Sequence, residues 1–78
     1  MPKISPVDWK LFEKFLLYIG CEFDRQKGSH RVYKKDGLKR PIIIPVHQKQ
    51  KLPVFIIKNS LRLLDIDNET YIQILKQI

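Results

Sequence analysis

The residues of this chain best suited to chemistry form the string Arg25-Gln26-Lys27-Gly28-Ser29-His30. An imidazole titrates near neutral pH, so a histidine can take up or release a proton under ordinary conditions. Gly28 and Ser29 add little bulk, which lets a phosphate or a backbone come close to His30. We expect His30 to act as a general base in metal-free phosphodiester cleavage. The alternative is a surface histidine beside a turn, with no catalytic role.

Positive charge is concentrated around this string. Residues 25–51 hold nine Lys and Arg residues against one acid, Asp36, whereas the rest of the chain is nearly neutral. The formal net charge of +7 therefore describes one patch, and such a patch attracts the phosphates of a nucleic acid. The residues expected to contact RNA are Arg25, Lys27, Ser29, Arg31, Tyr33, Lys34, Lys35, His47 and Lys49.

Two of these contacts have competing interpretations. Tyr33 has the same strand parity as Arg31 and Lys35, so its ring is expected on the open basic face, where it could stack on a base. An exposed tyrosine without a role is the alternative. His47 follows Pro45 and Val46 at the start of a basic loop. A solvent-exposed loop residue is the favoured interpretation of His47. The alternatives are a phosphate or base contact and the role of leaving-group acid.

Metal and cofactor sites are not expected. Two histidines 17 positions apart, one cysteine and scattered carboxylates do not match zinc or magnesium ligand patterns. There is no phosphate-binding glycine loop of a nucleotide enzyme. Cys21 lies at an apolar position of its strand and is expected in the core rather than as a nucleophile. A single cysteine also excludes an internal disulfide and fits a reducing compartment.

Length and composition predict one domain spanning residues 1–78. The longest apolar run, 42–46, is too short to cross a bilayer, and the first residues lack the apolar segment of a signal peptide. We therefore expect a cytoplasmic protein that does not bind membranes. The basic residues favour a nucleic acid or an acidic protein as partner.

The apolar spacing and the turn residues predict the elements that must position these side chains. Ser5 is expected to cap a first helix with Pro6 at its first position, and Gly20 to end it. Gly28-Ser29 and Asp36-Gly37 mark turns between strands. The expected elements after the first helix are strands at 21–27, 30–35 and 39–45, a polar loop at 46–52, a helix from Pro53, and a helix capped by Asp67 or Asn68.

Three strands joined by short turns should form an antiparallel meander. One face of the sheet would pack on the helices, and the open face would carry the basic side chains. The fold class expected is α+β: an α-β-β-β-α two-layer domain with an extra C-terminal helix, similar to the double-stranded-RNA-binding fold.

Several of these residues also carry a family resemblance. Gly20, the R-Q-K-G-S-H string, Pro45-Val46-His47 and a helix opened by Leu52-Pro53 resemble the HicA (YcfA-type) toxins. The resemblance implies a double-stranded-RNA-binding-like fold, an mRNA interferase activity and a partner antitoxin, HicB.

Carried over to this sequence, the motif histidine that the resemblance makes catalytic is His30, and the proline and histidine after the third strand are Pro45 and His47. Cys21 departs from the aromatic common after the glycine. Pro53-Val54-Phe55 replaces a frequent Gly-Thr pair, and only some members have the terminal helix.

Together with the resemblance, the residues predict a toxin that cleaves mRNA without a metal or cofactor. It should not cleave DNA, which lacks the 2′-hydroxyl, and specific DNA binding by this chain alone is not expected. Its antitoxin is expected to be acidic and to cover His30, the 25–35 hairpin and the 46–52 loop, with the terminal helix 68–78 extending the contact. Two alternatives stay open. One is a non-catalytic RNA-binding module with a basic sheet face, and the other is an interaction protein whose basic face binds only an acidic partner.

Overall fold

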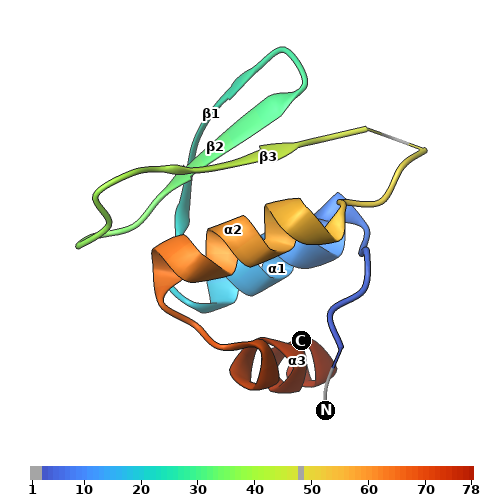
Figure 1. Cartoon of the computed structure of the whole chain (residues 1–78). Coiled ribbons are helices and arrows are strands. Elements are labelled where there is room, and N and C mark those ends of the chain that lie inside the picture. The colour runs from blue at the N-terminus through green and yellow to red at the C-terminus, as the bar shows by residue number, and fades with distance from the viewer. Residues whose placement is uncertain (1–2, 48) are drawn as a thin grey trace.

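A computed structural model describes residues 3–47 and 49–78, so Gln48 of the loop expected at 46–52 lies outside the described residues. The elements in chain order are α1 (Trp9–Tyr18), β1 (Glu22–Lys27), β2 (His30–Lys34), β3 (Ile42–Pro45), α2 (Val54–Leu64) and α3 (Asn68–Gln77). The strands form one antiparallel sheet in the order β1-β2-β3, with β2 in the centre (Figure 1). The α+β class and the order of elements are therefore as expected.

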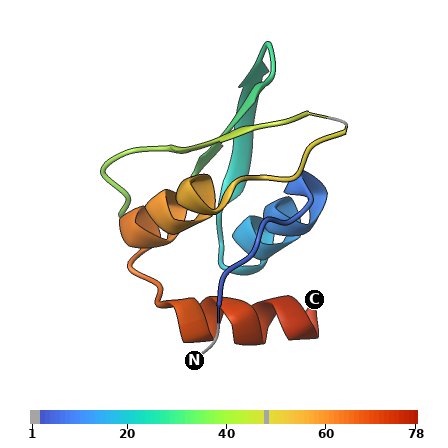
Figure 2. The ribbon, with the colours of Figure 1, turned by 45° about the vertical axis from the view of Figure 1, so that its right-hand side comes forward.

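The helices lie on one side of the sheet. α1 and α2 run beneath it as a pair, and α3 lies on the side of this pair that faces away from the sheet (Figures 1 and 2). The ring of Tyr71 in α3 packs edge-on against Phe15 of α1, with 4.9 Å between ring centroids. The terminal helix thus closes the far side of the helix pair and leaves the opposite face of the sheet open.

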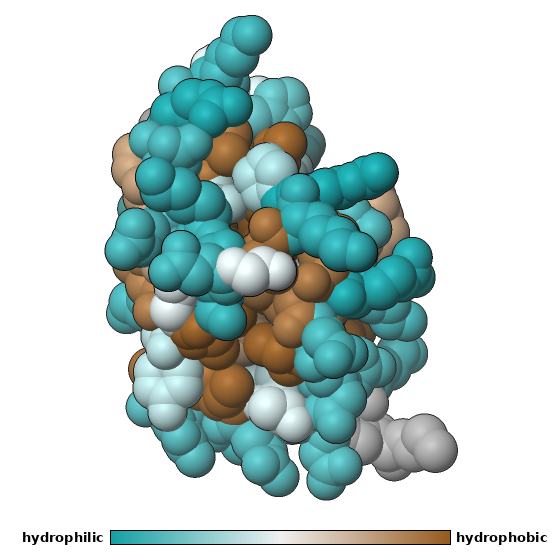
Figure 3. Space-filling view, turned by 90° about the vertical axis from the view of Figure 1, so that its left-hand side faces the viewer, coloured by the Kyte–Doolittle hydropathy of each residue, from teal (hydrophilic) through white to brown (hydrophobic). Residues whose placement is uncertain are grey.

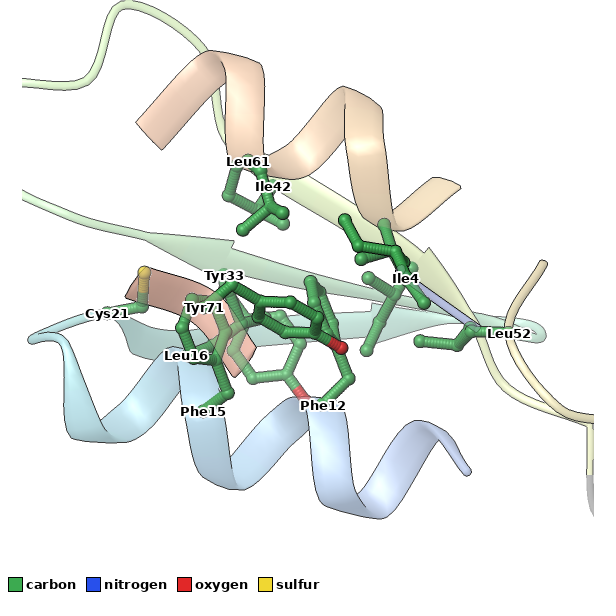
Figure 4. Close-up of a cluster of buried hydrophobic side chains, with 12 residues drawn as sticks. Ile4, Phe12, Phe15, Leu16, Cys21, Tyr33, Ile42, Leu52, Leu61 and Tyr71 are labelled. Carbon is green, nitrogen blue, oxygen red and sulfur yellow. The ribbon is translucent and has the colours of Figure 1, made fainter. Parts of the chain in front are cut away.

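The core forms where α1, α2 and the sheet meet (Figure 4). Phe12, Phe15 and Leu16 are spaced three and four residues apart, so one stripe of α1 faces inward. Ile42 and Ile44 alternate inward on β3. Burying a side chain of this size contributes roughly 1.5–3 kcal/mol relative to leaving it in water, so this core holds the sheet on the helices.

The first helix begins later than the sequence predicts. Asp8, not Ser5, is its N-cap, and the Asp8 carboxylate accepts the N–H of Lys10 at 3.0 Å. The cause is a tertiary contact: the N–H of Leu52 donates to the carbonyl of Val7 at 2.7 Å, which keeps the chain extended up to Val7. The prediction of a helix starting at Ser5 and Pro6 is therefore wrong.

The other predicted helix boundaries, including the end of α1, agree better with the structure. Gly20 has φ +101°, and the N–H of Cys21 donates back to the carbonyl of Leu16 at 2.9 Å, as in a left-handed helix cap. α2 begins directly after Pro53. Asp67 caps α3 by accepting the N–H of Thr70 at 2.7 Å, and this hydrogen bond lowers the pKa of the Asp67 carboxyl.

All three strands are shorter than predicted, β1 and β2 by one residue each and β3 by three. β3 starts at Ile42 rather than at residue 39, consistent with Pro41, which has no N–H to donate to a sheet. β1 contains a bulge: Phe23 pairs with Tyr33 and Arg25 with Val32, which leaves Asp24 without an opposite residue. The regular alternation of a strand at 21–27 is therefore broken at Asp24, and Arg25 lies on the same face as Lys27 and His30.

Candidate nucleic-acid interface

The β1–β2 hairpin carries His30 at its tip. Lys27 and His30 are the last register pair, and the two-residue turn Gly28-Ser29 joins them. Gly28 has φ +59°, a conformation that a two-residue hairpin turn requires and that glycine adopts without strain. The tip projects beyond the helices (Figures 1 and 2). His30 is exposed as the first residue of β2, as its position beside the turn predicts.

His30 lies in a shallow depression on the open face of the sheet. The depression has a volume of about 480 Å³ and is lined by Arg25, Lys27, His30, Val32 and Ile43. Two cations from β1 thus share this depression with the imidazole, together with the apolar side chains of Val32 and Ile43. Arg25 also contacts Asp24, but an exposed ion pair of this kind contributes only about 0–1 kcal/mol and can yield to a phosphate.

The loop that carries His47 begins at the same end of the sheet. Pro45 is the register partner of His30. The N–H of Val46 donates to the carbonyl of Ser29 at 2.7 Å, which ties the start of this loop to the hairpin turn. His47 follows directly and is exposed. The fold therefore brings the segments of the two histidines together, although they are 17 positions apart in the sequence.

Arg31 does not lie on the open face, and the prediction that placed it there is wrong. Neighbouring strand residues point to opposite faces, so Arg31 points toward α1 while His30 points away. Its Nη2 donates to the carboxylate of Glu13 at 2.9 Å, and its guanidinium lies 4.2 Å from the ring centroid of Phe23. The hydrogen bond with Tyr33 and the charge of Glu13 raise the pKa of Arg31, although desolvation opposes this shift. Its charge is paired with Glu13 on the α1 side of the sheet rather than presented on the open face.

Tyr33 is fully buried, so the prediction of a base-stacking tyrosine on the open face is also wrong. Its hydroxyl donates to the carboxylate of Glu13 and accepts from Nε of Arg31 at 3.0 Å. Burial, followed by the hydrogen bond to Glu13, raises the pKa of Tyr33 to about 12. The ring fills the core between the sheet and α1, and a nucleic-acid base cannot reach it.

The remaining predicted contacts spread along the sheet. Lys34 has the strand parity of His30 and is exposed four residues away, roughly 13 Å along the strand. Lys35 lies just past β2, half-buried near Gly20. Ser29 and Lys49 are exposed at the turn and in the following loop. A chain of phosphates could thus follow the open face from Lys34 to the hairpin tip.

Cys21 is buried, as expected for a core residue. Burial raises the pKa of its thiol, and the nearby charge of Lys35 opposes this effect only in part. The thiol is therefore poorly suited to act as a nucleophile. Among residues 3–47 and 49–78, no group of three or more His, Cys, Asp or Glu side chains could hold a metal ion. No helix in those ranges is long and apolar enough to span a bilayer.

Sequence reasoning missed the partner of Arg31. Glu13 and Trp9 are four residues apart and therefore lie on the same side of α1. The guanidinium of Arg31 lies 5.2 Å from the ring centroid of Trp9 and binds Glu13, so both residues serve the same cation. An acid and an aromatic ring at this spacing are the signal that could have indicated a bound cation.

Apolar surface is also exposed away from the sheet. On the side to which the β2–β3 connection projects, apolar groups gather in the lower middle of the surface and hydrophilic side chains border them (Figure 3). Large apolar side chains exposed on the helices include Leu17 and Tyr18 of α1 and Phe55 and Leu63 of α2. None of these four lines the depression at His30.

Comparison with known families places these features in a context. A family model described as "HicA toxin of bacterial toxin-antitoxin" matches residues 9–66. The matched range includes α1, the whole sheet and α2, and therefore both histidines. A search of curated proteins and a search of solved structures each find no match. Because the family model covers well over half of its length, the chain belongs to the HicA family, the toxins of bacterial toxin–antitoxin systems.

Proposed function

We propose that this toxin is an endoribonuclease that cleaves mRNA with His30 as its general base and without a metal ion. The observation that supports this most directly is the position of His30: an exposed imidazole at the tip of a hairpin, in a depression that it shares with Arg25 and Lys27. A proton acceptor beside two cations suits a reaction that both removes a proton and builds up negative charge.

RNA lies across the open face of the sheet, with Lys34 and Lys27 holding its phosphates. Neutral His30 takes the proton from a ribose 2′-hydroxyl. The 2′-oxygen then forms a bond to the adjacent phosphorus, and the bond from phosphorus to the 5′-oxygen of the next nucleotide breaks. The products are a 2′,3′-cyclic phosphate end and a 5′-hydroxyl end. DNA cannot react in this way because it lacks the 2′-hydroxyl.

Three groups supply the rest of the acceleration. General base catalysis contributes only about 10²–10⁴-fold, so charge and orientation must add more. Arg25 and Lys27 lie beside His30 and stabilise the extra charge on the phosphate. The departing 5′-oxygen needs a proton, and His47 supplies it, since its loop starts at the hairpin turn.

Cleavage of a long RNA in the presence of EDTA tests this function. Wild-type protein should cut the RNA and leave cyclic phosphate ends, and a substrate with 2′-deoxyribose should stay intact. His30→Ala should be folded and inactive, while Lys76→Ala, on the exposed surface of α3, should keep full activity. An active His30→Ala protein contradicts the proposal. RNA binding without cleavage by wild type indicates the non-catalytic binding module instead.

A further inference from the structure

We propose that a second hollow, on the other side of the hairpin tip from His30, binds the base of a nucleotide next to the cleaved phosphate and prefers guanine. Its adjacency to the cleaved bond rests on the proposed function of His30, whereas base binding itself does not. The hollow has a volume of about 390 Å³ and is lined by Trp9, Gln26, Gly28, Ser29, Arg31 and Val46.

The lining has the chemistry of a base-binding site. The indole of Trp9 is only half-buried. The guanidinium of Arg31 lies 5.2 Å from its ring centroid, and the rest of the indole offers a base a surface to stack on. The volume lies within the range of small-ligand sites, roughly 300–1,000 Å³. Gln26, Ser29 and Arg31 add polar groups to the lining, and Val46 adds one apolar side chain.

The polar groups of the hollow are held in fixed orientations. Gln26 Oε1 accepts from Nη1 of Arg31 at 2.8 Å, and Gln26 Nε2 donates to the carbonyl of Gly28 at 3.0 Å. These two bonds of opposite polarity determine which end of the amide is oxygen. On the other side, Glu13 and Tyr33 hold Nη2 and Nε of Arg31. Little reorganisation is therefore needed when a base enters.

The unused donors of Arg31 favour guanine. A guanidinium has five N–H donors, and three of them are bonded to Tyr33, Gln26 and Glu13. One N–H on each Nη atom is left over among the described contacts. A pair of donors on one guanidinium can match the O6 and N7 acceptors of guanine, the commonest specific arginine–base contact. Adenine offers only one acceptor on that edge, next to a donor.

The hollow and the His30 depression are close enough to serve one RNA chain. Arg31 follows His30 directly on β2, and the two side chains point to opposite faces of the hairpin. The two-residue turn is all that separates these faces at the tip. A Cβ added to Gly28 would meet nothing within 4 Å, so the space around the turn is open to a passing backbone. A strand cleaved at His30 can place its neighbouring base in the hollow.

Intrinsic fluorescence tests this site directly because Trp9 is the sole tryptophan of the chain. The probes are GMP, AMP, CMP and UMP, added to the full-length His30→Ala protein, with ribose 5-phosphate as the control for phosphate binding alone. GMP should quench Trp9 saturably and bind roughly tenfold more tightly than AMP. The 7-deaza analogue of GMP, which lacks N7, should lose most of this advantage.

Two variants connect the quenching to the named groups. Arg31→Lys removes the planar donor pair and should abolish the preference for GMP. If Arg31→Lys fails to fold, Gln26→Ala, at an exposed position, removes one group that orients Arg31 and should weaken GMP binding several-fold. Lys58→Ala, on the exposed surface of α2, is the matched control and should bind GMP like the parent protein.

The outcomes separate this site from the catalytic proposal. Saturable, GMP-selective quenching without RNA cleavage keeps the site and refutes the ribonuclease. Cleavage by wild type without base preference, together with no quenching by any nucleotide, refutes the site and keeps the ribonuclease. Equal weak quenching by all four nucleotides and by ribose 5-phosphate also overturns the proposal. Quenching that appears with an added antitoxin protein but with none of the nucleotides overturns it as well.

Discussion

Arg31 and Tyr33, two residues apart on β2, both point toward α1, and Nε of Arg31 donates to the hydroxyl of Tyr33 at 3.0 Å. Both side chains also bind the same carboxylate, that of Glu13. A half-buried cation is thereby neutralised and hydrogen-bonded between the sheet and the first helix. Removing one member of such a cluster leaves polar groups of the other members without a hydrogen-bond partner. A single removal should therefore lower the free energy of unfolding by more than the whole cluster contributes to it.

Tyr33→Phe should therefore destabilise the protein. The substitution keeps the buried ring but removes one of the two donors to Glu13 and leaves Nε of Arg31 without its acceptor, which should lower the free energy of unfolding by about 1–3 kcal/mol. Urea denaturation measures the change. Tyr71→Phe is the matched control, because the buried hydroxyl of Tyr71 has no hydrogen-bond partner within residues 3–47 and 49–78. That variant should be neutral or slightly more stable, and equal losses in both variants would contradict this explanation.

The same two tyrosines should limit stability at high pH. Burial raises the pKa of Tyr33 and of Tyr71 to about 12, above the usual value of about 10. A folded pKa above the unfolded one means that the stabilisation is fully present below pH 10 and is lost as the pH rises from 10 toward 12. Chemical denaturation across this range should show the decline.

The control for this effect is a residue that the solvent already reaches. Tyr18 is 58% exposed, so Tyr18→Phe should leave the alkaline decline unchanged. The double variant with phenylalanine at both buried positions should flatten it. A decline that persists in the double variant would assign the alkaline loss to other groups.

The amphipathic helices and the hairpin turn could be predicted from the sequence because their signals are local. The three- and four-residue apolar spacing of Phe12, Phe15 and Leu16 defines α1, and Gly28 defines the turn. These predictions needed only neighbouring residues. The position of His30 next to the turn follows from the same local pattern, so its exposure could be predicted as well.

The orientation of Arg31 and Tyr33 could not be predicted because it depends on a residue of another element. The charge of Arg31 and the matching strand parity of Tyr33 suggested the open face, but Glu13 binds both and draws them toward α1. The start of α1 was missed for a similar reason, since the contact between Val7 and Leu52 joins segments far apart in the chain. Long-range partners of this kind leave no periodic trace in the sequence.

His47 should act as the acid that protonates the leaving oxygen. His47→Ala should then slow cleavage of ordinary RNA by about 10²–10⁴-fold. A dinucleotide analogue whose leaving group is p-nitrophenolate needs little protonation, so the same variant should cleave it almost as fast as wild type. His30→Ala should fail on both substrates. If His47→Ala slows both substrates equally, His47 contributes to binding or folding rather than to leaving-group protonation.

RNA affinity should depend on salt through the lysines of the open face. Lys27 and Lys34 are exposed on that face, and each phosphate contact adds roughly 0.7 to the slope of log affinity against log salt for single strands. In the His30→Ala background, replacing both lysines with alanine should lower this slope by about 1.4. Replacing Lys58 and Lys76, on the helices, should leave it unchanged. The opposite pattern would place the RNA on the helical side of the domain.

The cognate antitoxin should be acidic where it meets the toxin, because it has to cover a basic site. We expect it to bury His30 and to contact the 25–35 hairpin and the 46–52 loop, where nine basic residues fall between 25 and 51. Charge complementarity speeds association, so the on-rate measured by stopped flow should fall as salt rises. Lys27→Glu should lower the on-rate at low salt, and the control Lys76→Glu should not.

The position of α3 makes it a marker of how far the antitoxin extends from His30. It lies on the side of the α1–α2 pair that faces away from the sheet, so a partner seated on His30 reaches it only by passing around the edge of the domain (Figure 2). Hydrogen–deuterium exchange of the complex should show protection at the hairpin tip and in the 46–52 loop, and protection of the exposed side of α3 if the partner extends that far. RNA should compete with the antitoxin for free toxin. A complex that still binds RNA at full strength, with the hairpin tip unprotected, would mean that the antitoxin inhibits from another surface.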